Sequence, residues 1–114
     1  MNFGHTVGHA VETVTGYTAY LHGEAVAIGM NIEAELSVLL GYLNDSDAYR
    51  IKAILTLYGL PSELPSGMSA ESMLSAMKID KKALAGEMRF VLPDKIGSVK
   101  IKKVSADKVS EVLR

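Results

Sequence analysis

The three histidines of this 114-residue chain all lie within its first 22 residues. His5 and His9 are four positions apart, so a helix through them would present both imidazoles on one face. His22 stands at the start of the next predicted helix and could return towards His5 across the intervening turn. Imidazole binds metals and exchanges protons near neutral pH, so the cluster predicts a metal site, acid–base chemistry or both. Catalytic zinc usually takes three protein ligands, which three histidines could in principle supply.

Small residues and one acid accompany the histidines. The glycines at 4, 8, 23 and 29 predict narrow surroundings in which backbone and substrate approach closely. Glu24 lies two residues after His22 and has two possible roles. It could orient the His22 ring as a hydrogen-bond acceptor, or it could place favourable charge at a helix N-terminus.

The elements that must position these residues are mainly helices. Apolar spacing and capping residues predict helices over 6–13, 22–40 and 44–58, a fourth capped by Ser69 and a last one capped by Ser105. Glycines 16, 41 and 59 would end the first three. Gly29 lies inside the second helix, where we expect close approach by another backbone or a ligand to compensate for it. The predicted buried positions are Ile28, Ile32, Leu36 and Leu39 on the second helix, Ile51, Ile54, Leu55 and Tyr58 on the third, and Met73, Leu74 and Met77 on the fourth.

A β-hairpin is predicted near the C-terminus, with strands over 88–92 and 99–104 and a turn over 93–98. Alternation in the second strand predicts that Val99 and Ile101 point inward and that Lys100 and Lys102 point outward. The fold class is therefore mainly α: one compact helical domain over residues 1–114 with a small hairpin.

Composition narrows the function classes. With 48% hydrophobic residues the chain can form a core, and without cysteine it has neither disulfides nor thiolate ligands. No stretch is apolar enough to span a membrane or to resemble a signal peptide, so we expect a cytoplasmic protein without membrane contact. Residues 1–77 hold eight acids and two bases, whereas residues 78–114 hold five acids and ten bases. The basic part is either a solvated surface or an anion site near Lys78, Lys81 and Lys82. Nucleic acid is not expected, because Phe90 is the only aromatic residue there.

Two blocks around the histidines resemble the 3-dehydroquinate synthase family. They are residues 2–12, NFGHTVGHAVE, and residues 21–30, LHGEAVAIGM. Asp80-Lys81-Lys82, Gly86, Arg89-Phe90-Val91-Leu92 and Ile96-Gly97 continue the resemblance, which covers essentially the whole chain. It implies a helical C-terminal domain of an enzyme that converts 3-deoxy-D-arabino-heptulosonate 7-phosphate to 3-dehydroquinate and phosphate in the shikimate pathway.

The resemblance also implies cofactors and roles. The family uses zinc or cobalt together with NAD. His5 and His22 would be metal ligands, with a glutamate from an N-terminal half as the third. Asn2 and His9 would bind the anionic groups of the sugar-phosphate substrate, His9 being the candidate catalytic residue. A lysine of the Lys81-Lys82 pair would reach the phosphate.

The chain departs from the family pattern by lacking the N-terminal α/β domain that holds most of the NAD site. We therefore expect no cofactor-binding residues here, an inactive isolated chain and possible homodimerisation through the uncovered face. Two alternatives stay open: a domain of another sugar-phosphate cyclase, or a stand-alone binding protein without catalysis.

Overall fold

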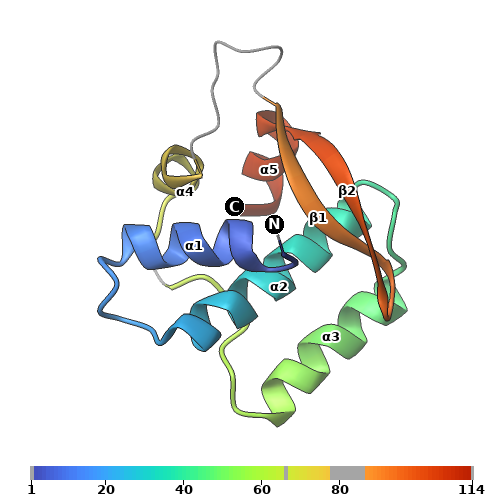
Figure 1. Ribbon diagram of the computed structural model, residues 1–114, viewed down its shortest axis with the longest axis horizontal. Helices are drawn as coiled ribbons and strands as arrows, with labels where there is room; N and C mark the ends of the chain where they lie inside the picture. Colours follow the sequence, from blue (N-terminus) through green and yellow to red (C-terminus); the bar gives the residue numbers. More distant parts are fainter. Residues whose placement is uncertain (1, 66, 78–86, 114) are drawn as a thin grey trace.

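A computed structural model describes residues 2–65, 67–77 and 87–113. Five helices and one hairpin follow one another in the described part of the chain (Figure 1). They are α1 His5–Val14, α2 His22–Leu39, α3 Asp45–Leu57, α4 Ala70–Ala76, β1 Glu87–Lys95, β2 Ser98–Ser105 and α5 Ala106–Leu113. The predicted fold class, mainly helical with a C-terminal hairpin, is confirmed. None of the helices within these ranges is long and apolar enough to cross a membrane.

Helix boundaries lie where the capping residues place them. The side chain of Asn44 accepts a hydrogen bond from the Asp47 backbone N–H, and the hydroxyl of Ser69 accepts one from the Ser72 backbone N–H. Gly16, Gly41 and Gly59 follow the ends of α1, α2 and α3 with φ values of 72°, 83° and 72°. This left-handed conformation favours glycine, so the predicted stops are confirmed.

The core is built around α2, which contacts α1, α3, α5 and β1. In Figure 1, α1 crosses α2, and α5 lies beside β1 and β2. The largest fully buried side chains include Phe90, Ile28, Leu36 and Met73. Met77 and Leu74 are buried as well, which confirms that this apolar group fills the core. The Ser37 hydroxyl joins α2 to the hairpin by donating to the Pro93 carbonyl oxygen.

The backbones of α1 and α2 meet at glycines. A β-carbon on Gly29 would overlap the Gly4 carbonyl oxygen and lie 2.6 Å from the Gly8 nitrogen. A β-carbon on Gly8 would lie 2.9 Å from the Ala25 carbonyl oxygen. The expected compensation for Gly29 is therefore close approach by another backbone. This contact fixes the start of α1, which carries His5, against α2.

The burial predicted for β2 was wrong at Val99, Ile101 and Lys102, whereas Lys100 is exposed as predicted. Val99 is 47% exposed and Ile101 is 63% exposed, whereas Lys102 is half-buried. Phe90 pairs with Lys102 and Leu92 with Lys100, and directly paired residues of an antiparallel ladder lie on the same face. Since Phe90 fills the core, Lys102 lies on the core side of the hairpin, and its ammonium lies 4.7 Å from the centre of the Tyr42 ring.

Two further burial predictions were wrong. On α3 only Leu55 is buried, whereas Ile54 and Tyr58 are 50% and 75% exposed. At the end of α2, Leu39 is also exposed. The contacts of α3 with the described elements are mainly with α2, so its other faces remain at the surface.

Candidate metal and substrate site

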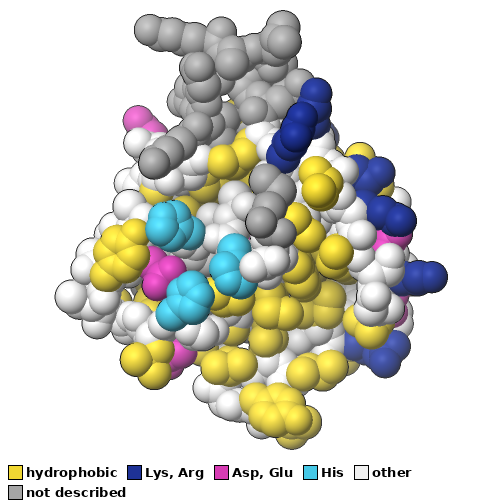
Figure 2. Space-filling view, in the orientation of Figure 1, with side chains coloured by type: hydrophobic (Ala, Val, Ile, Leu, Met, Phe, Trp, Pro, Cys, Tyr) yellow, Lys and Arg dark blue, Asp and Glu magenta, His cyan; other side chains and the backbone are white. Residues whose placement is uncertain are grey.

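The three histidine side chains gather on one face of the molecule (Figure 2). They border a pocket of about 370 Å³. Its lining is Asn2, His5, Thr6, His9, His22, Ala76, Met77 and Met88. The fold thus brings together four of the six candidate site residues, and Lys81 and Lys82 lie outside the described residues.

His5 is the first residue of α1. Its Nδ1 lies 3.3 Å from the Phe3 carbonyl oxygen. A carbonyl oxygen can only accept, so Nδ1 carries the proton in this hydrogen bond. The Nε2 of a neutral His5 therefore keeps its lone pair, which is the arrangement a metal-binding histidine needs.

His22 begins α2 and is oriented by an acid of α1. Its Nδ1 lies 3.1 Å from Glu12 Oε1, and the Glu12 side chain is only 11% exposed. An ionised carboxylate can only accept, so a neutral His22 in this hydrogen bond carries its proton on Nδ1 and keeps the lone pair of Nε2. Glu24 serves α2 instead: its Oε1 accepts a hydrogen bond of 2.8 Å from the Leu21 N–H and so caps the helix. Of the two roles considered for Glu24, the structure supports the one at the helix terminus.

His5 and His22 form a pair whose donor set fits a divalent metal. Their ring centres are 5.6 Å apart and the ring planes are inclined by 64°. Within residues 2–65, 67–77 and 87–113, no group of three or more ligating side chains could hold a metal ion. Two imidazoles are one fewer than the three protein ligands that a catalytic zinc usually takes.

Glu33 fixes the backbone that carries His5. Its carboxyl group is fully buried and accepts hydrogen bonds of 2.9 Å from the N–H groups of Gly4 and Val7. These N–H groups lie at the N-terminus of α1, where Gly4 offers no side-chain cap. Burial raises the pKa of Glu33 from 4.5 to about 7, although both hydrogen bonds lower it. A carboxyl group of α2 thus replaces the missing local cap of α1.

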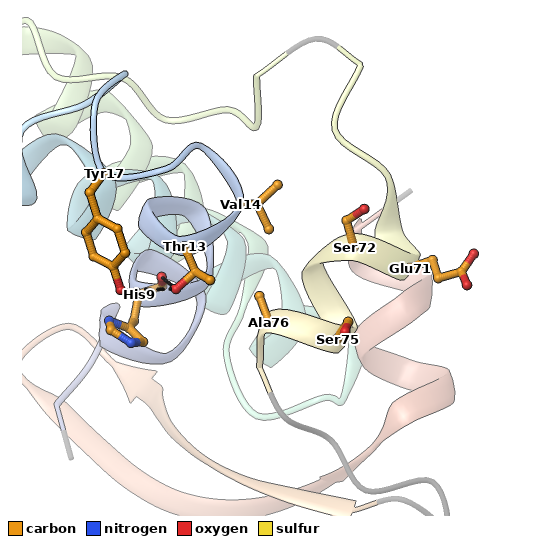
Figure 3. Close-up of a pocket in the computed structure, with 8 residues that line it drawn as sticks. All are labelled: His9, Thr13, Val14, Tyr17, Glu71, Ser72, Ser75 and Ala76. Carbon is orange, nitrogen blue, oxygen red and sulfur yellow. Dashed lines mark hydrogen bonds between the residues drawn. The ribbon is translucent and has the colours of Figure 1, made fainter.

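His9 is exposed and borders a second hollow as well as the histidine pocket. This groove, about 810 Å³ in volume, lies between α1 and α4, and Figure 3 shows the residues that border it. Asn2 is tied to the start of α1, since its carbonyl oxygen accepts a hydrogen bond of 3.2 Å from the His5 N–H. Asn2 and His9 border the same pocket as the His5–His22 pair.

Sequence reasoning missed the roles of Glu33 and Glu12. Glu33 interrupts the apolar stretch of α2 four residues after Gly29, and a charged residue one turn beyond a glycine contact could have indicated a buried cap. Glu12 lies on the same side of α1 as the histidines at helical spacing, but its pairing with His22 depends on the turn between α1 and α2.

Comparison with known proteins decides the family. Residues 1–83 match the family model described as 3-dehydroquinate synthase C-terminal. The chain belongs to the 3-dehydroquinate synthase family. It is 48% identical to 3-dehydroquinate synthase of Thermodesulfovibrio yellowstonii over 114 residues, which are 99% of this chain and 32% of that protein. The corresponding enzyme of Nostoc punctiforme is 46% identical, with 100% of this chain and 32% of that protein covered. The chain therefore spans about a third of the length of these 3-dehydroquinate synthases.

Solved structures show the same fold in related synthases. A 2-deoxy-scyllo-inosose synthase complexed with carbaglucose-6-phosphate, NAD+ and Co2+ superposes with a TM-score of 0.84 at 23% identity, over 98% of this chain and 32% of that one. The 2-epi-5-epi-valiolone synthase of Streptomyces hygroscopicus, with NAD+ and Zn2+ bound, superposes with a TM-score of 0.80 at 28% identity. It matches 97% of this chain and 31% of its own length.

Proposed function

We propose that this chain acts as the metal- and substrate-binding domain of a 3-dehydroquinate synthase. The observation that carries the proposal is the His5–His22 pair, in which each Nδ1 is held by an acceptor and each Nε2 is left for a metal. The pair borders one pocket together with Asn2 and His9. The substrate would be 3-deoxy-D-arabino-heptulosonate 7-phosphate, and the products 3-dehydroquinate and phosphate.

Different residues of the chain would bind the metal and the substrate. His5 and His22 would hold zinc or cobalt, and the Phe3 carbonyl and Glu12 would keep their rings in the ligating tautomer. The bound metal would polarise the substrate hydroxyls and ease their loss of a proton. Asn2 and His9 donate hydrogen bonds to anionic groups of the substrate, and His9 holds or releases a proton at its exposed ring.

The remaining parts of the site come from outside the described residues. Lys81 or Lys82 contributes a positive charge to the phosphate. A glutamate and the NAD site come from an α/β half, in keeping with relatives about three times as long as this chain. The isolated chain then lacks one ligand and the oxidant, so it does not turn over.

A related sugar-phosphate cyclase is the second candidate. The superposition on 2-epi-5-epi-valiolone synthase favours it, since that structure is 28% identical to this chain. The higher identity to 3-dehydroquinate synthases, 48% over essentially the whole chain, makes these the better guide to the substrate.

A zinc titration by calorimetry tests the metal site. The chain should bind zinc weakly, and His5→Ala and His22→Ala should each abolish the binding. His9→Ala is the matched control, because His9 lies on the same face of α1 but outside the pair, and it should leave zinc binding unchanged. Zinc binding that survives both substitutions would refute the assignment.

A further inference from the structure

Tyr17 has an unfavourable backbone conformation. Its φ is 63°, and no other non-glycine among the described residues has a positive φ. With Gly16 at 72° it forms two successive left-handed residues that fold the chain back after α1, and its N–H donates to the Glu12 carbonyl oxygen at 2.8 Å. A β-carbon is crowded in this conformation, which glycine adopts freely. The Tyr17 side chain is 58% exposed, so burial in the core does not explain why a tyrosine stands here.

The side chain of Tyr17 contacts His9 instead. The two rings meet edge to face, with centres 6.2 Å apart and planes inclined by 67° (Figure 3). The Tyr17 hydroxyl lies 3.2 Å from Thr13 Oγ1, and Thr13 Oγ1 donates to the His9 carbonyl oxygen at 3.0 Å. The hydroxyl of Thr13 has one proton, which this second bond uses, so Tyr17 is the donor to Thr13. Tyr17 is thereby anchored beside His9 by its ring and by its hydroxyl.

The His9 side chain could otherwise rotate about its side-chain bonds, and the contact with Tyr17 would limit that rotation. It is exposed, and an exposed side chain on a helix ordinarily exchanges between rotamers. Tyr17 borders the groove between α1 and α4 but not the pocket of His5 and His22. Its ring therefore contacts His9 from the side of the groove.

We propose that Tyr17 is a positioning residue that turns the His9 imidazole towards the pocket containing Asn2, His5 and His22. The ordering of His9 stands on the contacts above, whereas its consequence for turnover rests on the function proposed for this site. The strained backbone at Tyr17 is the conformation that places the ring against His9.

The first test measures the order of the His9 ring in the full chain by NMR. In the parent chain, side-chain coupling constants should report one χ1 rotamer of His9, with nuclear Overhauser contacts to the Tyr17 ring. Tyr17→Gly should leave His9 averaged between rotamers while the Tm stays within about 5 °C of the parent value, because glycine suits the local φ. Tyr58→Gly removes another exposed tyrosine at a helix end, where φ is −87°, and should leave His9 ordered.

The second test measures turnover after this chain is joined to the NAD-binding portion of a 3-dehydroquinate synthase relative. Tyr17→Gly should lower kcat about 10-fold with a smaller effect on KM, because misplacing a reacting group impairs the chemical step. In a His9→Ala background, Tyr17→Gly should cause no further loss, since the effect of Tyr17 passes through His9.

The outcomes separate the two proposals. A His9 ring that is already averaged in the parent chain, or that stays ordered in Tyr17→Gly, overturns the positioning role whatever the turnover. Equal fractional losses in the parent and His9→Ala backgrounds overturn it as well. A parent fusion that folds without turnover counts against the proposed function, and the NMR result still decides the role of Tyr17.

Discussion

Replacing Glu33 by glutamine should destabilise the fold although the two side chains have nearly the same shape. The buried carboxyl group presents two oxygens to two N–H donors, those of Gly4 and Val7, each at 2.9 Å. A protonated carboxyl group can still accept at both oxygens, whereas the amide nitrogen of glutamine has no free lone pair. One N–H at the start of α1 would therefore face another donor.

The expected magnitude follows from that single unsatisfied donor. Leaving one buried N–H without an acceptor costs about 1–3 kcal/mol. Glu33→Ala leaves both donors unsatisfied and opens a cavity, so it should cost about 3–5 kcal/mol. These losses are large against the roughly 5–15 kcal/mol by which domains are ordinarily stable.

The difference between the parent and Glu33→Gln should depend on pH. Burial raises the pKa of Glu33 from 4.5 to about 7, so between these values the folded chain binds more protons than the unfolded chain. The free energy of unfolding of the parent therefore falls as pH rises through this window, by about 3 kcal/mol for a shift of this size. The glutamine variant lacks this dependence. The loss of stability of the variant relative to the parent should be greatest at pH 5 and should have largely disappeared by pH 8.

Urea unfolding followed by circular dichroism at pH 5, 6, 7 and 8 measures both effects. The free energy of unfolding of the variant is subtracted from that of the parent at each pH. The contribution of the histidines, which both chains share, cancels in this difference. Glu35→Gln is the matched control on the same helix. The Glu35 oxygen accepts from the Asn31 amide at 3.2 Å, and a glutamine oxygen can do the same. Partial burial raises the pKa of Glu35 as well, but its side chain is exposed and screened by solvent, so the expected change is below about 0.5 kcal/mol. A Glu33→Gln variant as stable as the parent at pH 5, or a loss of stability that grows with pH, would show that Glu33 does not cap α1 as a buried, protonated carboxyl group.

Two further predictions concern the helix contact and the histidine pair. Gly29→Ala should cost more than about 3 kcal/mol in thermal or urea unfolding, because its β-carbon would overlap the Gly4 carbonyl oxygen. Gly23→Ala in the same helix meets no atom within 4 Å and should be neutral or stabilising; equal effects at both positions would contradict the packing argument. Glu12→Gln should weaken zinc binding about 10- to 100-fold in calorimetry, since Glu12 orients the His22 ring. Glu24→Gln, which can still cap α2, should bind zinc like the parent, and a larger loss there than at Glu12 would reverse the assignment.

Local signals in the sequence were sufficient for most of the fold. Asn44 and Ser69 cap helices, and Gly16, Gly41 and Gly59 end them, because these effects depend on a few neighbouring residues. Burial was harder to predict. Ile54 of α3 and Ile101 of β2 are apolar and periodic, yet both are exposed, because the amount of core that covers a strand or helix face depends on distant elements.

The sequence also predicts only part of the candidate site. The His5–His22 pairing follows from the turn between two adjacent helices, which the sequence indicates. The partner of His22 is Glu12 and not Glu24, and this choice depends on how α1 crosses α2. Glu33 is 29 positions from Gly4, and only the tertiary contact reveals that its carboxyl group caps α1.

Phosphate release by a fusion protein tests whether this chain supplies the metal and substrate ligands of a 3-dehydroquinate synthase. The fusion joins this chain to the part of the 3-dehydroquinate synthase of Thermodesulfovibrio yellowstonii that this chain does not cover, in a relative that is 48% identical. With zinc, NAD and 3-deoxy-D-arabino-heptulosonate 7-phosphate, the fusion should release phosphate, whereas the chain alone and the His22→Ala fusion should remain at background. A folded, NAD-binding fusion without phosphate release, or one whose rate is unchanged by His22→Ala, would show that this chain does not have that role.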